Sequence, residues 1–510
     1  MVDKGIGSWL TVHRDQSPHK VALISGEREL TYKQLNSRVN KLANSFLKLG
    51  VRKGDRINVL LFNSIELMET LFACAKIGAI FVPINYRLSV EEVEYIVRDS
   101  GAHYLIYEER TSQIIYGLRE RVNEMNHYIY VGEATDYTDL TYEHLINQSR
   151  DNEPGFELEE HDLHMMMYTS GTTGKPKGAM LTHGNTLWNA INVLHGLNLS
   201  KDDITLTVAP LFHIGGMNIL TTPLLYIGGT VVLQDVFQPH NVLEEIQSRR
   251  VTTLFLVPAM WMALINSSSF DQYDISSMKM NISGGAPCPI TIIEFFQQQN
   301  IPFYEGFGLT ETAPFVSLLD KENAHRKNGS VGKHPMHTRV RIVDEQDRDV
   351  EANQVGELAV KGPNVFAGYW NKPEETKQVM KEGWFHTGDL AKVDEEGFVY
   401  IVDRKKDMVV SGGENIYPIE LEQVMYTHPN IQEVAVVGIP DEQWGEVPKA
   451  YIVLKNDQHS LSLESIKAFC QPKLAGFKLP KQAEFLDALP RNATGKILKT
   501  HLRKAHSVNR

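Results

Sequence analysis

Cysteine is scarce in this sequence, and neither a long apolar run nor an excess of basic residues is present. The three cysteines are Cys74, Cys288 and Cys470, and no two of them form a Cys-x-x-Cys pair. Because their number is odd and their spacing wide, the sequence indicates neither a disulfide framework nor a zinc site. Reduced thiols are typical of a reducing compartment, so we expect a cytoplasmic protein.

No stretch approaches the roughly 20 apolar residues of a membrane-spanning helix. The first residues, MVDKGIGSWLTVHRDQ, also lack the apolar segment of a signal peptide. Peripheral contact with a membrane stays open. The formal net charge of −12 argues against general binding to nucleic acid, which normally requires a basic surface. An anionic ligand must therefore meet a local positive site.

The length and composition predict a large α/β protein. A chain of 510 residues with 42% apolar content can bury a large core and should divide into two or more domains. Short apolar runs such as INVLLF, ITLTVAP and TLFLVPA alternate with helical patterns, the order that builds parallel β-α-β units. One such helix, YKQLNSRVNKLANSFLKLG, should end at Gly50, and Ser89 followed by Glu92 predicts a capping box.

The pattern changes at about Val331. Shorter strands such as VRIVD, GELAVKG and FVYIVDR are separated by Gly, Asp and Pro turns, which favours an antiparallel, barrel-like subdomain. After Asp403 a charged stretch, RKKD, leads into a compact unit of strands and helices. We therefore predict an N-terminal domain, residues 1–403, of parallel-sheet αβαβα subdomains plus the barrel-like one. A small, mobile α+β domain, residues 404–510, should follow.

The segment YTSGTTGKPKGAMLTH, residues 168–183, combines glycines, hydroxyls and two lysines. Glycine lets backbone N–H groups approach phosphate oxygens, and lysine supplies positive charge, so the segment suits a polyphosphate. Composition alone leaves a flexible surface loop open. A Walker A loop is excluded, because Pro176 stands where its second glycine belongs.

This segment resembles the phosphate-binding signature of the adenylate-forming superfamily, which contains acyl-CoA synthetases, luciferases and the adenylation domains of peptide synthetases. Further motifs follow in the family's order: EGFGLTET, GELAVKGPNVFAGYW, WFHTGDL and PRNATGKILK. The resemblance spans nearly the whole chain. It implies a two-step reaction in which a carboxylate attacks the α-phosphorus of ATP to give acyl-AMP and pyrophosphate. The thiol of coenzyme A then displaces AMP.

The resemblance implies roles for individual residues. Lys496 would be the catalytic cation at the α-phosphate, Glu311 the carboxylate that holds Mg²⁺, and Thr310 a phosphate contact. Negative charge grows on the phosphoryl oxygens during transfer, and Mg²⁺ prefers oxygen ligands. Asp389 would accept both ribose hydroxyls, and Arg404 would contact ribose and phosphate. The other implied nucleotide-binding residues are Thr169, Ser170, Gly171, Thr172, Thr173, Gly174 and Lys177 for the phosphates, and Gly284, Gly285, Ala286, Glu305, Gly306 and Phe307 for the adenine.

The segment PLFHIGGMN is similar to the family's acyl-binding segment. His213 would lie near the carboxylate and gate the thiol, and Gly215, Met217 and Asn218 would line the acyl pocket. Some long-chain members have a tryptophan gate where this chain has Met217, so a strict long-chain tunnel is in doubt.

The resemblance also implies a large rotation of the C-terminal domain about a hinge at Lys406. This rotation would bring the segment SGGEN toward the active site, where it would line the coenzyme A channel. Its candidate residues are Ser411, Gly412, Gly413 and Glu414.

The sequence therefore predicts an AMP-forming carboxylic acid:CoA ligase that uses ATP, Mg²⁺ and coenzyme A. A medium- or long-chain fatty acid is the favoured substrate, because no charged residue stands out in the acyl segments; an aryl or carnitine-like acid stays open. One alternative is a stand-alone adenylating enzyme that loads a carrier protein. Another is a catalytically dead nucleotide-binding regulator, which predicts damage at Lys496, Glu311 or Asp389, and none is seen. A homodimer also stays open.

Overall fold

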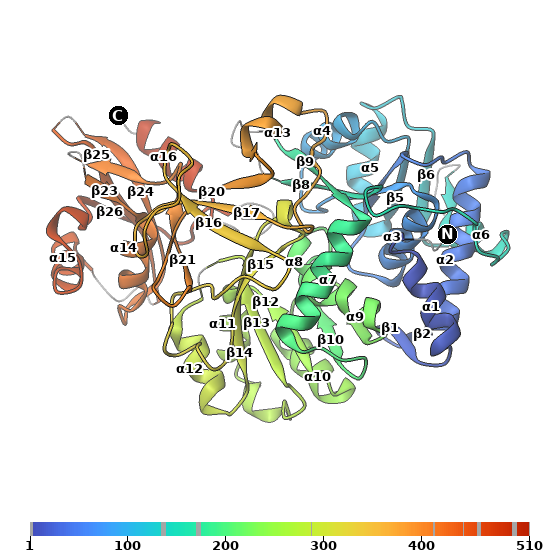
Figure 1. Ribbon diagram of the computed structural model, residues 1–510, viewed down its shortest axis with the longest axis horizontal. Coiled ribbons are helices and arrows are strands. Elements are labelled where there is room, and N and C mark those ends of the chain that lie inside the picture. Colours follow the sequence, from blue (N-terminus) through green and yellow to red (C-terminus); the bar gives the residue numbers. More distant parts are fainter. Residues whose placement is uncertain are drawn as a thin grey trace. The chain divides into compact units, whose positions relative to one another are not determined.

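A computed structural model describes residues 4–133, 139–169, 175–286, 288–411, 414–441, 443–455, 461–491 and 497–508. The chain forms two compact units (Figure 1). The first comprises Met1–Val340 and Val360–Phe385, and the second Arg341–Ala359 and His386–Arg510. The predicted domain boundary between residues 403 and 404 stays a prediction.

Two eight-stranded sheets build the first unit. The order of one is β18-β9-β8-β4-β3-β5-β6-β7, and that of the other is β15-β14-β13-β12-β10-β11-β1-β2. The strands of the first sheet are β3 (Arg56–Leu60), β4 (Ile80–Pro83), β5 (Tyr104–Glu108), β6 (His127–Val131), β7 (Leu140–Thr141), β8 (Leu163–Thr169), β9 (Lys177–Thr182) and β18 (Gly368–Tyr369). Those of the second are β1 (Val21–Ser25), β2 (Arg28–Thr31), β10 (Ile204–Thr207), β11 (Thr230–Leu233), β12 (Thr253–Leu256), β13 (Met280–Gly284), β14 (Phe303–Gly308) and β15 (Phe315–Leu319).

Both sheets are parallel in their central strands and antiparallel at the edges, at β8–β9, β9–β18, β14–β15 and β1–β2. The predicted β-α-β organisation is thus confirmed. The strand β9, within the glycine-rich segment, was not among the strands expected from the sequence.

Helices cover the sheets in five alternating layers, α/β/α/β/α. The inner layer packs both sheets into one core and contains α1 (Ser8–Gln16), α2 (Tyr32–Lys48), α3 (Ile65–Ile77), α6 (Tyr142–Asn147), α7 (His183–Leu197) and α9 (Thr222–Ile227). The outer helices of the first sheet are α4 (Val90–Ser100) and α5 (Ser112–Arg119), and those of the second are α10 (Pro239–Arg249), α11 (Pro258–Ile265) and α12 (Ile290–Gln298). In Figure 1, α7 lies between the two sheets, against β9 and β15.

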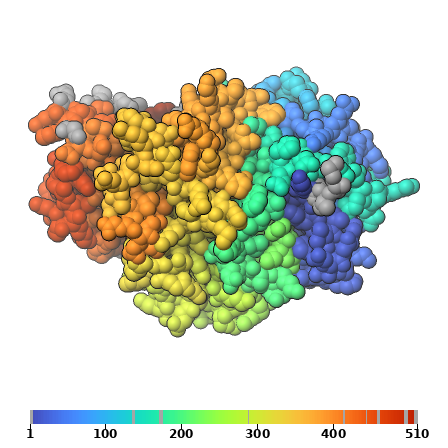
Figure 2. All heavy atoms as spheres, in the orientation of Figure 1, coloured from blue at the N-terminus to red at the C-terminus, as the bar shows by residue number. Residues whose placement is uncertain are grey.

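Segments distant in sequence meet within this first unit. Strand β1 pairs with β11, and the hydroxyl of Tyr32 donates a hydrogen bond to the carbonyl of Gly229 at 2.7 Å. On the surface, too, blue N-terminal spheres adjoin green ones from later in the chain (Figure 2).

Local signals in the sequence set several helix ends. Ser89 and Glu92 form the predicted capping box at the start of α4, and Gly50, just beyond α2, has a left-handed φ of 91°. Glycine takes that conformation without the steric cost of a Cβ atom. Within the described residues, no helix combines the length and apolar character needed to span a membrane.

A third sheet has five strands, β16 (Arg339–Val343), β17 (Gly356–Lys361), β19 (Met380–Lys381), β20 (Trp384–Val393) and β21 (Val399–Arg404). The pairs β19–β20 and β20–β21 are antiparallel, as the sequence predicted for this region. The division between the two units falls within β16, β17 and β20. Helix α13 (Pro373–Val379) lies between β18 and β19 in the chain.

The second unit contains a fourth sheet, in the order β23-β22-β25-β24 with β26 beside β25. Its helices form two apolar clusters with the sheet, one with α14 and α15 and one with α16. This is the small α+β body that the sequence predicted. The elements are β22 (Val409–Ser411), β23 (Glu414–Ile416), β24 (Ile431–Asp441), β25 (Gly445–Leu454), β26 (Gln482–Phe485), α14 (Pro418–Tyr426), α15 (Leu463–Cys470) and α16 (Lys499–Val508).

Candidate functional site

The glycine-rich segment connects the two strands of a hairpin. Thr169 ends β8 and Lys177 begins β9, and the two residues are register partners. Residues Ser170 to Gly174 lie outside the described residues. Lys177 is largely buried, forms an ion pair with Glu375 of α13, and holds its ammonium 5.1 Å from the ring centre of Tyr369. The hairpin thus places a cation within the segment predicted to bind phosphate.

Glu311 lies on a short 3-10 turn, η4 (Thr310–Thr312), and is buried. The hydroxyl of Tyr369 donates a hydrogen bond to Glu311 Oε1 at 2.8 Å. Tyr369 belongs to β18, which pairs with β9, the strand that begins at Lys177. One carboxylate and one cation are therefore held by the same tyrosine.

This arrangement fits a magnesium site in which the nucleotide supplies the other ligands. Mg²⁺ is usually held by one or two carboxylates together with substrate phosphates and water. The described part of the chain contains no group of three or more His, Cys, Asp or Glu side chains that could hold a metal. A single carboxylate, Glu311, oriented by a buried hydroxyl, suits a metal that arrives with ATP.

The residues predicted for the adenine lie at the carboxyl ends of neighbouring strands. Gly284 ends β13, and its register partner on β14 is Gly306, followed by Phe307. A Cβ atom on Gly284 would lie 3.0 Å from the Gly306 carbonyl oxygen, and Gly285 has a left-handed φ of 83°. In parallel sheets ligands bind beyond these carboxyl ends. Ala286 follows on the exposed turn.

Glu305 precedes this pair and is fully buried. Its Oε1 accepts a hydrogen bond from the backbone N–H of Cys288 at 3.1 Å, whereas its Oε2 is buried without a hydrogen-bond partner among the described residues. Burial raises the pKa of Glu305 to about 8. The carboxyl is therefore mainly protonated at neutral pH and adds no negative charge beside a nucleotide.

The acyl-binding segment folds as a helix with an irregular turn. His213 directly precedes α8 (Ile214–Gly216), which continues through the π-helical turn η2 (Met217–Thr221) into α9. A π-turn is frequent at functional sites. Met217 and Asn218 are fully buried. Asn218 donates a hydrogen bond from Nδ2 to the carbonyl of Ala313 at 3.2 Å, which ties η2 to the chain just after Glu311.

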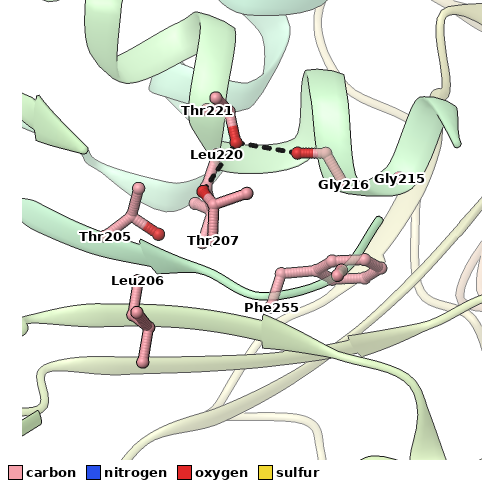
Figure 3. Close-up of a pocket in the computed structure, with 9 residues that line it drawn as sticks. Thr205, Leu206, Thr207, Gly215, Gly216, Leu220, Thr221 and Phe255 are labelled. Carbon is pink, nitrogen blue, oxygen red and sulfur yellow. Dashed lines mark hydrogen bonds between the residues drawn. The ribbon is translucent and has the colours of Figure 1, made fainter. Parts of the chain in front are cut away.

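A small cavity lies beside this segment, and its volume is about 10 Å³ (Figure 3). Such a volume holds about one water molecule. Of the predicted acyl-pocket residues, Gly215 lines this cavity. The lining residues are Thr205, Leu206, Thr207, Ala209, Gly215, Gly216, Leu220, Thr221 and Phe255.

Asp389 and Arg404 lie in the second unit as register partners on β20 and β21. Arg404 Nε is 2.6 Å from Asp389 Oδ1, and Asp389 is buried. The guanidinium thus fixes the carboxylate in an orientation suited to hydrogen-bond acceptance. Lys406 is exposed in the turn that follows β21.

Ser411 and Glu414 flank the tip of the β22–β23 hairpin, where they are register partners. Gly412, Gly413 and Lys496 lie outside the described residues, so their predicted roles stay predictions. Sequence reasoning missed Tyr369 and Glu375 as partners of Glu311 and Lys177, although Tyr369 lies within the matching segment GELAVKGPNVFAGYW.

Comparisons with known proteins agree with this geometry. Residues 10–370 match the family model described as AMP-binding enzyme, and residues 420–496 match the AMP-binding enzyme C-terminal domain. The chain therefore belongs to the AMP-binding enzyme family, as an AMP-forming acid–thiol ligase.

The relatives match this chain along its whole length, and their names indicate that they act on different acids. The chain is 40% identical to a feruloyl-CoA synthase of Amycolatopsis sp, with 99% of each chain covered. It is 37% identical to a long-chain-fatty-acid–CoA ligase of Mycobacterium tuberculosis, again with 99% of each covered. A solved structure of o-succinylbenzoate coenzyme A synthetase from Bacillus subtilis, in complex with ATP and magnesium ion, is 32% identical and has a TM-score of 0.86. That match covers 97% of this chain and 99% of the other.

Proposed function

We propose that this protein is an AMP-forming carboxylic acid:CoA ligase that prefers a compact aromatic acid. In the first step the carboxylate attacks the α-phosphorus of ATP, so that acyl-AMP forms and pyrophosphate leaves. In the second step the thiol of coenzyme A attacks the acyl carbon, and AMP leaves with the electron pair of the broken acyl–oxygen bond.

The observation that carries the reaction is the group formed by Glu311, Tyr369 and Lys177. When bound, Mg²⁺ neutralises charge on the phosphate oxygens. Glu311 is available to hold it, oriented by the Tyr369 hydroxyl at 2.8 Å. Lys177 lies within the glycine-rich segment, and we expect it to stabilise the pyrophosphate leaving group. Phosphoryl transfer depends mainly on such positioning and fixed charge.

The rest of the nucleotide site is proposed from the family resemblance. Lys496 acts as the cation at the α-phosphate, and Asp389 binds the ribose hydroxyls. The buried carboxylate of Asp389 and its 2.6 Å contact with Arg404 support this role, because an oriented carboxylate can accept from two adjacent donors.

The polarity of the cavity beside the acyl segment supports a compact acid. A long alkyl chain requires a deep apolar tunnel, whereas this cavity is bounded by the ring of Phe255 and by threonine hydroxyls. Hydroxyls that face an alkyl chain lose their hydrogen bonds, which is unfavourable. The feruloyl-CoA synthase relative supports an aromatic acid, and the fatty-acid ligase relative keeps the fatty acid as a second candidate.

A panel of acids tests this function. We expect AMP formation to depend on both coenzyme A and acid, and kcat/KM to be at least tenfold higher for cinnamic or benzoic acids than for octanoate or palmitate. A higher value for palmitate would favour the fatty acid that the sequence analysis preferred. Turnover with a carrier-protein thiol but none with coenzyme A would refute the ligase and favour the stand-alone adenylating enzyme.

Variants test the proposed cation. Lys496→Ala should abolish pyrophosphate–ATP exchange while ATP still binds, because the lost charge serves the transition state. Lys481→Ala, which removes an exposed lysine of the same unit, should leave exchange unchanged. Equal exchange rates in the two variants would contradict the role of Lys496. The cytoplasmic location and the homodimer stay predictions.

A further inference from the structure

One hydroxyl in the cavity beside the acyl segment has no partner. Thr205 lies on β10, is 0% exposed and lines the cavity. Its Oγ1 makes no hydrogen bond to any residue that the structure describes. Buried hydroxyls are nearly always paired, because an unpaired one loses its bonds to water without replacement. The atom therefore leaves a hydrogen-bonding position open to a ligand atom or to a water molecule.

A second hydroxyl lies beside the first. Thr253 on β12 is the register partner of Thr205 on the adjacent parallel strand. Register partners point to the same face of a sheet, and adjacent strands lie about 4.8 Å apart. Thr253 is also buried, and its Oγ1 likewise has no hydrogen-bond partner within the described chain. Two neighbouring hydroxyls on the same face of the sheet thus have unused hydrogen-bonding capacity.

The hydroxyls at the other end of the cavity are paired. Thr207 Oγ1 is 2.8 Å from Thr221 Oγ1, and Thr221 donates to the carbonyl of Gly216 at 2.7 Å (Figure 3). Because the single proton of Thr221 goes to Gly216, Thr207 must donate to Thr221. The proton of Thr207 is thus used, and no hydrogen bond joins Thr207 to Thr205, which lies two residues or about 7 Å earlier on the strand.

The shape of the cavity defines what can reach Thr205. Phe255, two residues after Thr253 on the same face of β12, forms one wall, and Gly215 lies opposite. A Cβ atom on Gly215 would come within 3.1 Å of the Phe255 ring. The cavity extends to Ala209, four residues before His213, the residue predicted to lie near the carboxylate. Its volume of about 10 Å³ accepts one atom the size of a water oxygen.

We propose that Thr205, supported by Thr253, determines specificity by hydrogen bonding to a single polar substituent, such as a hydroxyl, at the end of the acid remote from its carboxylate. The water-sized space beside Thr205 suits one terminal oxygen of the acid. A site with an unpaired buried hydroxyl favours the acid that completes its hydrogen bond over the analogue that lacks the group. This inference rests on the proposed ligase function.

The test compares two acids that differ in one oxygen, 4-hydroxycinnamate and cinnamate. We expect the wild-type enzyme to have a kcat/KM at least tenfold higher for 4-hydroxycinnamate. Thr205→Val, which keeps the shape of the side chain but removes the hydroxyl, should reduce that ratio to about one. It should do so mainly by lowering activity toward 4-hydroxycinnamate. Thr205→Ser retains a hydroxyl and should restore the preference.

Thermal unfolding without substrates gives an independent result. Because Thr205 is unpaired, the valine variant should melt at the same temperature as the wild type or higher. A lower melting temperature would show that its hydroxyl is already paired within the protein, and would overturn the inference.

The failure of this inference can be distinguished from the failure of the proposed function. If the wild type forms acyl-CoA from both cinnamates with equal kcat/KM, or if Thr205→Val keeps the preference, the specificity role is wrong and the ligase function stands. If the wild type forms acyl-CoA from no acid of the panel, the ligase function itself is wrong, and the inference fails with it.

Discussion

The hydroxyl of Tyr369 offers the most direct test of how the magnesium carboxylate is held. Tyr369→Phe removes one donor from Glu311 Oε1, 2.8 Å away in a buried site. The ring itself stays, so its edge-to-face contact with Phe366, at 4.9 Å, and its contact with Lys177, at 5.1 Å, are retained. The substitution therefore isolates the hydrogen bond.

The expected effect follows from the charge of the acceptor. A hydrogen bond to a charged group contributes roughly 1.5–3 kcal/mol, and about 1.4 kcal/mol corresponds to a tenfold change. Loss of a group that orients a metal ligand typically weakens metal binding or activity by about 10- to 100-fold. We expect the Mg²⁺ concentration that gives half-maximal pyrophosphate–ATP exchange to rise by a similar factor. Saturating Mg²⁺ should recover most of the rate.

The matched control is Tyr107→Phe. The Tyr107 hydroxyl also donates to a carboxylate, Asp139 Oδ2 at 2.5 Å, on a strand of the same unit that is not part of the site. Its loss should leave the Mg²⁺ dependence unchanged. An unaltered Mg²⁺ dependence in Tyr369→Phe, or an equal shift in both variants, would refute the reasoning.

Three further predictions concern packing, pH and the nucleotide. Gly216→Ala should lower the melting temperature by several degrees, because the new Cβ atom would lie 2.4 Å from a backbone oxygen. Gly476→Ala is the control: its Cβ atom would have no neighbour within 4 Å, so the melting temperature should hardly change. Burial lowers the pKa of His183 to about 4 and lowers that of the stacked His164. For His183, protons therefore bind the unfolded chain first, so its contribution to stability is complete above about pH 6.5 and falls by about 2 kcal/mol between pH 7 and 5. The raised pKa of the buried Glu305 acts in the opposite direction, so urea unfolding of the wild type is compared with that of His183→Gln; the same pH dependence in both would contradict this. Asp389→Asn should raise the KM for ATP at least tenfold, and an unchanged KM would exclude its ribose contact.

Local sequence signals were sufficient to predict the elements whose structure depends on residues close together in the chain. The capping box of Ser89 and Glu92 needs only three residues of separation, and the alternating strands and helices needed only periodicity. The strand Lys177–Thr182 was not predicted, because the glycines and prolines around it are typical of a loop and its pairing with β8 and β18 depends on tertiary structure.

The candidate site divides along the same line. Motifs identified Glu311, but its partner Tyr369 lies 58 residues away. Tertiary contacts bring the two together, namely the pairing of β18 with β9 and the hydrogen bond from the Phe366 N–H to the Glu311 carbonyl. Thr205 shows most clearly what the sequence could not predict. In ITLT the threonines alternate with apolar residues, a pattern typical of a strand with one solvated face. That face is instead covered by η2, so the polar side chains became the lining of a cavity.

The π-helical turn Met217–Thr221 also has a consequence for how such pockets change. It holds one residue more than an α-helical turn would need, and the Thr221 hydroxyl binds the carbonyl of Gly216 five positions earlier. Deleting one residue here would restore the α-helix and turn every preceding side chain of the segment by about 100° relative to α9. A single-residue deletion in this turn would therefore redirect the side chains that line the cavity, a change that no single substitution here could make.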